Sequence, residues 1–180
     1  METKFYTLKV AGLTRQLPIC PVNEKLDIAA FIMFSDVELT IAVSKAIIEK
    51  CPEHDVIITA ESKGIPLAYE MARQLGKKYL VARKSAKLYM NAPISIDVKS
   101  ITTEGVQTLY LDSSEADYMK GKRVLIADDV ISTGESLHAL EELVTRSGGI
   151  ITGRAAVLAE GDAAQRDDII YLEELPLFFK

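Results

Sequence analysis

The sequence predicts an α/β fold, in which a mostly parallel, twisted sheet carries helices on both faces. Short apolar segments alternate along the chain with segments whose apolar residues recur at helical spacing. The chain has 180 residues, 48% hydrophobic and 26% charged, which is the composition of a globular domain. We therefore expect a single domain over 1–180, with an N-terminal part at 1–34 and a core at 35–180.

The first elements of the core follow from local signals. A helix over about 35–51 is predicted because Ser35-Asp-Val-Glu38 has the spacing of a capping box. Residues 55–60 predict a short buried strand. A helix over 64–76 follows, with apolar residues at helical spacing and a glycine at the position of a C-cap.

The second half of the core repeats this alternation. Residues 79–82 and 124–127 predict two further strands, and the helix after the latter ends at Gly148. That helix places four apolar residues on one face: Leu137, Leu140, Leu143 and Val144. Segments 150–158 and 169–172 predict the last two strands.

Two regions depart from the alternation. Residues 1–34 contain Pro18 and Pro21 and few helical signals, whereas residues 85–115 have the pattern of a polar hairpin with arms at 94–101 and 107–111.

Charge and cysteine content exclude several classes of protein. Lys plus Arg total 21 against 26 for Asp plus Glu, a net charge of −5, which argues against a general nucleic-acid binder. No apolar run approaches the roughly 20 residues of a membrane-spanning helix, and no secretory signal is apparent.

Cys20 and Cys51 are expected to be reduced thiols in the cytoplasm. His54 and His138 lack the spacing of zinc ligands and are expected at the surface.

The segment after the strand at 124–127 has the composition of a divided binding site. Asp128 and Asp129 are followed by two apolar residues and then by a loop that opens a helix: Ser132, Thr133, Gly134, Glu135 and Ser136. Backbone N–H groups at a helix N-terminus, with hydroxyl groups beside them, bind a phosphate. Two carboxylates beside this loop would repel the phosphate, so they must face ribose hydroxyls or a divalent cation. A phosphorylated sugar satisfies both halves.

Two more loops are expected at the same edge, because ligands of such sheets bind beyond the carboxyl ends of the strands. The first, after residue 60, is Glu61-Ser62-Lys63-Gly64. The second, after residue 82, carries three cations: Arg83, Lys84 and Lys87. Both bring positive charge suited to an anionic ligand.

The stretch 124–136 resembles the binding motif for 5-phosphoribosyl 1-diphosphate (PRPP) of the type I phosphoribosyltransferases. The resemblance implies that Asp128 and Asp129 hold the ribose hydroxyls, that residues 132–136 cradle the 5′-phosphate, and that Mg²⁺ is bound together with PRPP. The position of Glu135 is often glycine in that family, so its side chain is expected to point to solvent. The loops at 61–64 and 83–87 would contact the diphosphate.

The rest of the chain extends the resemblance. An Arg-Lys-x-x-Lys sequence after the matching strand is similar to that of the adenine and xanthine enzymes. Residues of about 85–115 would form the mobile loop that closes over PRPP, and 1–34 a hood over the base. A homodimer that acts on PRPP and a free purine base, with no nucleic-acid or membrane partner, is implied.

The resemblance favours adenine as the base. The small Ser132 occupies a position where hypoxanthine and guanine enzymes have Asp. Glu160 stands where xanthine enzymes have a Lys, and a carboxylate accepts a hydrogen bond from an exocyclic amine. Glu104 is the candidate proton donor in the mobile loop. A xanthine- or orotate-type transferase and a non-catalytic PRPP-sensing regulator remain the alternatives.

Overall fold

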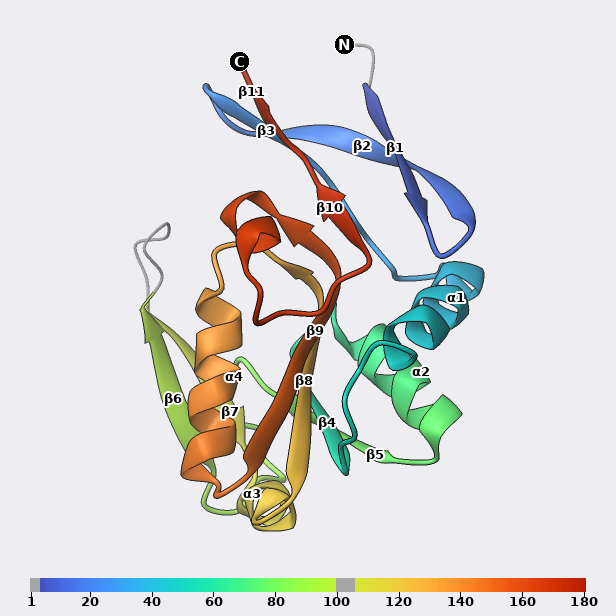
Figure 1. Ribbon diagram of the computed structural model, residues 1–180. Helices are drawn as coiled ribbons and strands as arrows, with labels where there is room; N and C mark the ends of the chain where they lie inside the picture. The colour runs from blue at the N-terminus through green and yellow to red at the C-terminus, as the bar shows by residue number, and fades with distance from the viewer. Residues whose placement is uncertain (1–3, 100–105) are drawn as a thin grey trace.

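The computed structural model describes residues 4–99 and 106–180, and its centre is a five-stranded parallel sheet (Figure 1). The strand order is β10-β9-β8-β4-β5, and every neighbouring pair is parallel. The strands are β4 (Val56–Ala60), β5 (Lys78–Ala82), β8 (Arg123–Ile131), β9 (Ile150–Glu160) and β10 (Glu173–Leu175). The predicted fold class is confirmed.

Both faces of this sheet are covered, which explains the apolar strand sequences. All five residues of β4 are buried. Ile57 belongs to the apolar cluster that contains the helices on one face, and Ile58 to the cluster on the other. A parallel strand between two helical layers has no solvent face, so it is apolar throughout instead of alternating.

The helices divide between the two faces as predicted (Figure 1). Helices α1 (Val37–Ile48) and α2 (Ile65–Leu75) pack on one face, while α3 (Ser113–Met119) and α4 (Glu135–Arg146) pack on the other. The four apolar residues predicted for the inner side of α4 are all buried. Helix α3 was not predicted, although its capping box of Asp112 and Glu115 is visible in the sequence.

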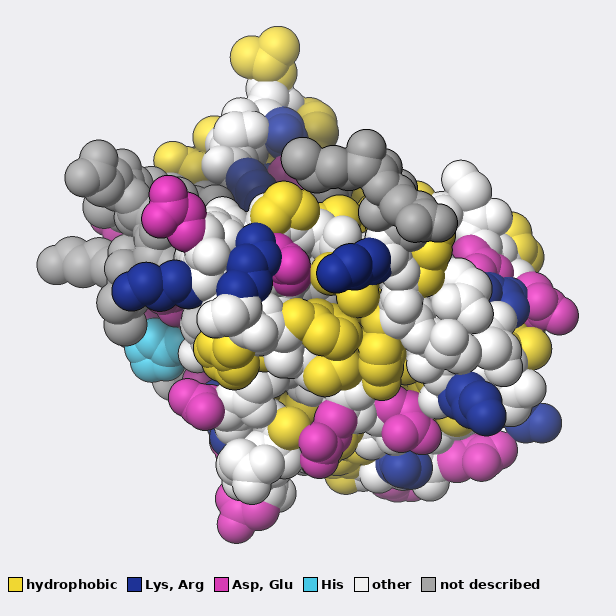
Figure 2. Space-filling view, turned by 90° about the horizontal axis from the view of Figure 1, so that it is seen from above, with side chains coloured by type: hydrophobic (Ala, Val, Ile, Leu, Met, Phe, Trp, Pro, Cys, Tyr) yellow, Lys and Arg dark blue, Asp and Glu magenta, His cyan; other side chains and the backbone are white. Residues whose placement is uncertain are grey.

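A second, antiparallel sheet lies over the carboxyl ends of β8 and β9 (Figure 1). Its order is β1-β2-β3-β11, formed by β1 (Phe5–Val10), β2 (Leu13–Asn23), β3 (Leu26–Ala29) and β11 (Leu177–Phe179). We call this sheet the hood. The hood therefore contains a C-terminal strand besides residues 1–34, because Leu177–Phe179 pair with Leu26–Ile28. Figure 2 views the molecule from above and shows hydrophobic side chains near the middle of this face, with charged side chains around them.

The predicted hairpin is present as β6 (Ile94–Lys99) and β7 (Val106–Leu111), an antiparallel pair. Ile96 and Leu109 turn into the core beside α4, which holds the hairpin on that side of the molecule. In the described part of the chain, no helix is long and apolar enough to cross a membrane.

Several predictions were wrong in detail. Residues 169–172 do not form a strand: Ile170 makes a single bridge to Ala155, and regular pairing with β9 begins only at Glu173. This segment is apolar because it packs, with Ile169 buried, and not because it forms a continuous ladder.

The first helix begins one residue later than the capping-box pattern indicated. The N-cap of α1 is Asp36, whose carboxylate accepts from Leu39 N, because Arg15 of β2 holds that carboxylate at 2.6 Å.

His54 was expected at the surface, but it is buried, 4% exposed, just before β4. Its Nδ1 lies 2.9 Å from the Pro52 carbonyl oxygen, and burial lowers its pKa.

Candidate active site

The two acids lie inside β8, near its carboxyl end. The sequence predicted a strand that stops at residue 127, but Val130 and Ile131 continue the pairing with β9. Asp129 is 3% exposed, and its N–H donates to the Asp128 carboxylate at 2.9 Å. The strand therefore carries both carboxylates rigidly up to the sheet edge.

Desolvation dominates the electrostatics of this acid pair. Removal of the Asp128 carboxyl from water, and then the charge of Asp129, raise its pKa well above the ordinary value of an aspartate. The opposing cation is Lys63, whose Nζ lies 3.6 Å from Asp129 Oδ2. That buried oxygen accepts no hydrogen bond from the described residues. Among the residues that the structure describes, the pair is therefore short of hydrogen-bond donors.

The loop after β4 reaches the acids because residue 64 is a glycine. A Cβ atom there would lie 2.3 Å from Thr59 Oγ1 and 2.8 Å from Asp128 Oδ1. No side chain fits at these distances, so Gly64 lets the loop pack directly against Asp128. The same loop carries Ser62 and Lys63 into position beside the acids.

Glu61 joins this loop to the cationic loop after β5. Its carboxylate accepts from Lys84 N at 3.0 Å and lies 3.7 Å from Arg83 Nη1 and 3.9 Å from Lys87 Nζ. The Lys84 N–H and these cations lower the pKa of Glu61. Arg83 also pairs through its backbone with Tyr110 of β7, at 2.8 and 2.7 Å. The cationic loop is thus held between β4 and the hairpin.

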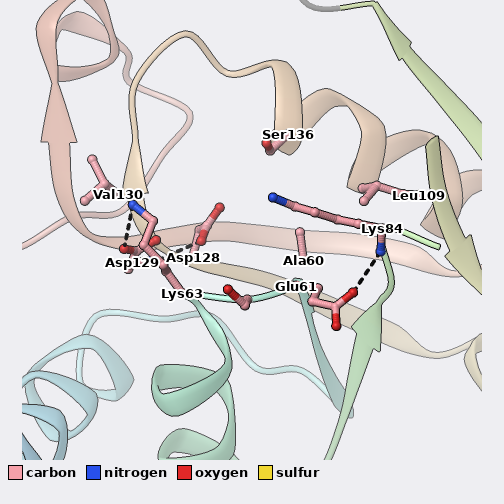
Figure 3. Close-up of a pocket in the computed structure, with 10 residues that line it drawn as sticks. Ala60, Glu61, Lys63, Lys84, Leu109, Asp128, Asp129, Val130 and Ser136 are labelled. Carbon is pink, nitrogen blue, oxygen red and sulfur yellow. Dashed lines mark hydrogen bonds and ion pairs between the residues drawn. The ribbon is translucent and has the colours of Figure 1, made fainter. Parts of the chain in front are cut away.

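The acids and both loops line one pocket of about 200 Å³ (Figure 3). In Figure 3 the Lys84 side chain extends across the pocket, between Ser136 of α4 and Glu61. Most lining residues were predicted site residues: Glu61, Ser62, Lys63, Lys84, Asp128, Asp129 and Ser136. The sequence missed Ala60, Leu109 and Val130, which also line it; Ala60 and Val130 directly flank predicted residues.

A smaller pocket of about 50 Å³ adjoins the first one at the N-terminus of α4. It is lined by Ser132, Thr133, Gly134, Glu135 and Ser136, and it shares Asp128, Val130 and Ser136 with the larger pocket. Gly134 is the N-cap residue at φ 81°, and no side chain caps the helix in the described chain. The N–H groups of the first helical turn point out of a helix end and suit an anion.

The remaining predicted residues lie around these pockets. Arg83 and Lys87 line neither pocket and pair with Glu61 instead. Glu160 ends β9 and also lines neither; burial raises its pKa, and the nearby charge of Lys63 opposes this shift. Glu135 is partly buried, and the direction of its side chain toward solvent stays a prediction. Glu104 lies outside the described residues.

Comparisons with known proteins agree with this geometry. Residues 35–175 match the phosphoribosyl transferase domain family. The chain is 35% identical over 127 residues to adenine phosphoribosyltransferase of Rhodococcus jostii, covering 70% of this chain and 69% of the relative. It is 30% identical over 155 residues to the enzyme of the same name from Mycobacterium avium, covering 84% and 82%.

A solved structure supports the same assignment. The crystal structure of adenine phosphoribosyltransferase from Thermoanaerobacter pseudethanolicus superposes with a TM-score of 0.65 at 25% identity, over 77% of this chain and 80% of that one. The family match covers most of the chain, including the acids and all three loops. The chain therefore belongs to the type I phosphoribosyltransferase family and is similar to its adenine phosphoribosyltransferases.

Proposed function

We propose that this protein is a purine salvage enzyme that converts adenine and PRPP into AMP and pyrophosphate. The observation that carries the proposal is the pair of adjoining pockets, one with three carboxylates and two lysines and the other at a helix N-terminus. The ribose hydroxyls and the diphosphate of PRPP would match the larger pocket, and its 5′-phosphate would match the helix N-terminus. The names of the relatives support adenine as the base.

In this proposal the acids bind the ribose. Asp128 and Asp129 accept hydrogen bonds from the 2′- and 3′-hydroxyls, which supply the donors that the acid pair lacks among the described residues. Residues 132–136 hold the 5′-phosphate, and Lys63 and Lys84 face the diphosphate. Ser62 lines that side of the pocket, and Gly64 lets the loop pack against Asp128.

Glu61 has a positioning role in this scheme. Its carboxylate already lies beside Arg83 and Lys87 and accepts from Lys84 N, so it orders the cationic loop before the diphosphate arrives. A preordered array of cations stabilises the charge that develops on the departing pyrophosphate at little reorganisation cost.

Mg²⁺ fits this pocket as a companion of PRPP. Asp128 and Asp129 are assigned to the ribose hydroxyls, so we expect Mg²⁺ to have no direct protein ligand and to be held through PRPP. No cluster of three or more metal-ligating side chains occurs in residues 4–99 and 106–180, so diphosphate oxygens and water would supply the coordination. When bound, Mg²⁺ would neutralise charge on the diphosphate.

Glu160 is our candidate for recognition of the base. It ends β9 beneath the hood, and burial raises its pKa. Its carboxyl group would accept from the exocyclic amine of adenine and would disfavour a purine with an oxo group there. Glu104 is retained as the candidate proton donor to the base.

The test is a panel of free bases with PRPP and Mg²⁺, scored by release of pyrophosphate. We expect kcat/KM for adenine to exceed that for xanthine, hypoxanthine, guanine and orotate by at least about tenfold, the scale of one recognition contact. A preference for another base would overturn the assignment of adenine as the substrate but leave the assignment as a phosphoribosyltransferase intact. Binding of PRPP without turnover of any base would favour a PRPP-sensing regulator.

We also propose a cytoplasmic homodimer. Exposed apolar side chains line a groove of about 410 Å³ between α1 and α2: Phe34, Val37, Ile41 and Tyr69. Exposed apolar patches of this kind are typical of protein interfaces. Sedimentation should give a dimer that Val37→Glu dissociates; a monomeric wild-type protein would contradict this.

The proposed location in the cytoplasm rests on the cysteines. Free Cys20 and Cys51 suit a reducing compartment.

A further inference from the structure

Arg166 comes back to the N-terminus of α4 from a different part of the chain. It follows the short 3-10 helix η1 (Gly161–Gln165), which leaves the carboxyl end of β9. A Cβ atom on Gly134 would lie only 3.0 Å from Arg166 Nη1. One nitrogen of the guanidinium therefore lies against the middle of the loop at 132–136.

The orientation of this guanidinium is set by a bidentate ion pair. Arg166 Nε and Nη2 donate to the two carboxylate oxygens of Asp168 at 2.8 and 2.7 Å. That pair occupies one edge of the planar group and leaves Nη1 on the side of the loop. The Arg166 side chain is 36% exposed, so it remains accessible to a ligand.

The ion pair is tied in turn to α4. Asp168 lies 3.9 Å from Arg154 Nε, and Arg154 donates to Glu141 of α4. Charges of alternating sign thus connect Arg166 to the same helix whose first turn forms the small pocket. Arg166 is held in place relative to that pocket by side chains far from it in the sequence.

The small pocket has an acidic lining. Its described lining includes two carboxylates, Asp128 and Glu135, and neither lysine nor arginine. Lys63 and Lys84 line the larger pocket instead. A phosphate dianion beside these carboxylates is repelled unless positive charge is close, and arginine is well suited to phosphate oxygens.

We propose that Arg166 binds the 5′-phosphate of PRPP and of the nucleotide product, an inference that rests on the proposed function. Arg166 would be a phosphate-binding residue supplied from outside the PRPP motif. It brings positive charge to the loop at 132–136, in which Glu135 stands where related sequences often have glycine. Its ligand class is a phosphate monoester of a pentose.

The experiment measures binding by calorimetry with ribose 5-phosphate and, separately, with Mg²⁺ and pyrophosphate. Arg166→Ala should weaken ribose 5-phosphate by about 10- to 100-fold, the scale of hydrogen bonds to a charged group, and leave pyrophosphate unchanged. Arg166→Lys should recover part of the loss. The matched control is Arg146→Ala, which removes an arginine from the far end of α4, where it pairs with Glu142.

The outcomes separate this inference from the proposed function. Unchanged binding of ribose 5-phosphate in Arg166→Ala, or an equal loss for both ligands, overturns the role of Arg166. If Arg166→Ala does not fold, Asp168→Asn keeps the arginine but loosens its orientation, and it should weaken only ribose 5-phosphate. A wild-type protein that binds both ligands but transfers no base refutes the proposed enzymatic activity. In that case the binding data of the Arg166 variants still decide whether Arg166 binds the phosphate.

Discussion

Replacement of Gly64 by alanine should damage the site far more than the fold. The backbone of Gly64 has φ −74° and ψ −13°, which alanine adopts without strain, so only the added methyl group matters. That methyl group would lie 2.3 Å from Thr59 Oγ1, 2.8 Å from Asp128 Oδ1 and 3.3 Å from Asp128 Cα. The loop must therefore move away from β8. Overpacking of this kind costs about 1–3 kcal/mol of unfolding free energy.

The same movement separates Lys63 from Asp129 and shifts the diphosphate side of the pocket. A displacement of about 1 Å costs on the order of 100-fold in rate, so we expect that loss in kcat/KM for PRPP. Gly76→Ala is the matched control at the other end of α2. No atom lies within 4 Å of its added methyl group, but φ is +64°, so it should lose about 1–2 kcal/mol of stability and keep full activity.

Urea denaturation and steady-state kinetics of the two variants decide the matter. The reasoning fails if Gly64→Ala retains wild-type kcat/KM, since the contact with Asp128 would then be unimportant. It also fails if Gly76→Ala loses as much activity as Gly64→Ala, because the loss would then follow stability and not the geometry of the pocket.

Three further predictions concern the carboxylates. Desolvation raises the pKa of Asp128 in the folded protein, so the folded state binds the carboxyl proton more tightly than the unfolded state does. The free energy of unfolding therefore falls as pH rises from the unfolded to the folded pKa of this group. Asp128→Asn should remove this dependence of stability on pH, and it should weaken PRPP use by roughly 1–3 kcal/mol. An unchanged slope would assign it to another group. Glu61→Gln should raise KM for PRPP with less than about 1 kcal/mol lost in stability, because the ion pairs are partly exposed; an unchanged KM would remove its positioning role. Glu160→Lys should shift the ratio of kcat/KM from adenine toward xanthine, and a constant ratio would place base recognition elsewhere.

The sequence by itself determined those features whose cause is local. The strands at β4, β5, β8 and β9 are buried on both faces, so their apolar runs are unmistakable, and parallel order brings their carboxyl ends to one edge. The acids and the loop at 132–136 occupy one continuous segment, so their spacing could be recognised directly. Even there, the end of β8 was placed four residues early, because acidic residues inside a strand resemble its end.

The tertiary structure alone decided which distant residues meet. Nothing local in the sequence indicates that Asp128 excludes a side chain at residue 64, or that Glu61 lies beside Arg83 and Lys87. The burial of His54 was equally hidden. Local patterns reflect the immediate backbone and one buried face. Contacts between segments depend instead on how the loops of neighbouring strands pack at the sheet edge, which only the folded chain specifies.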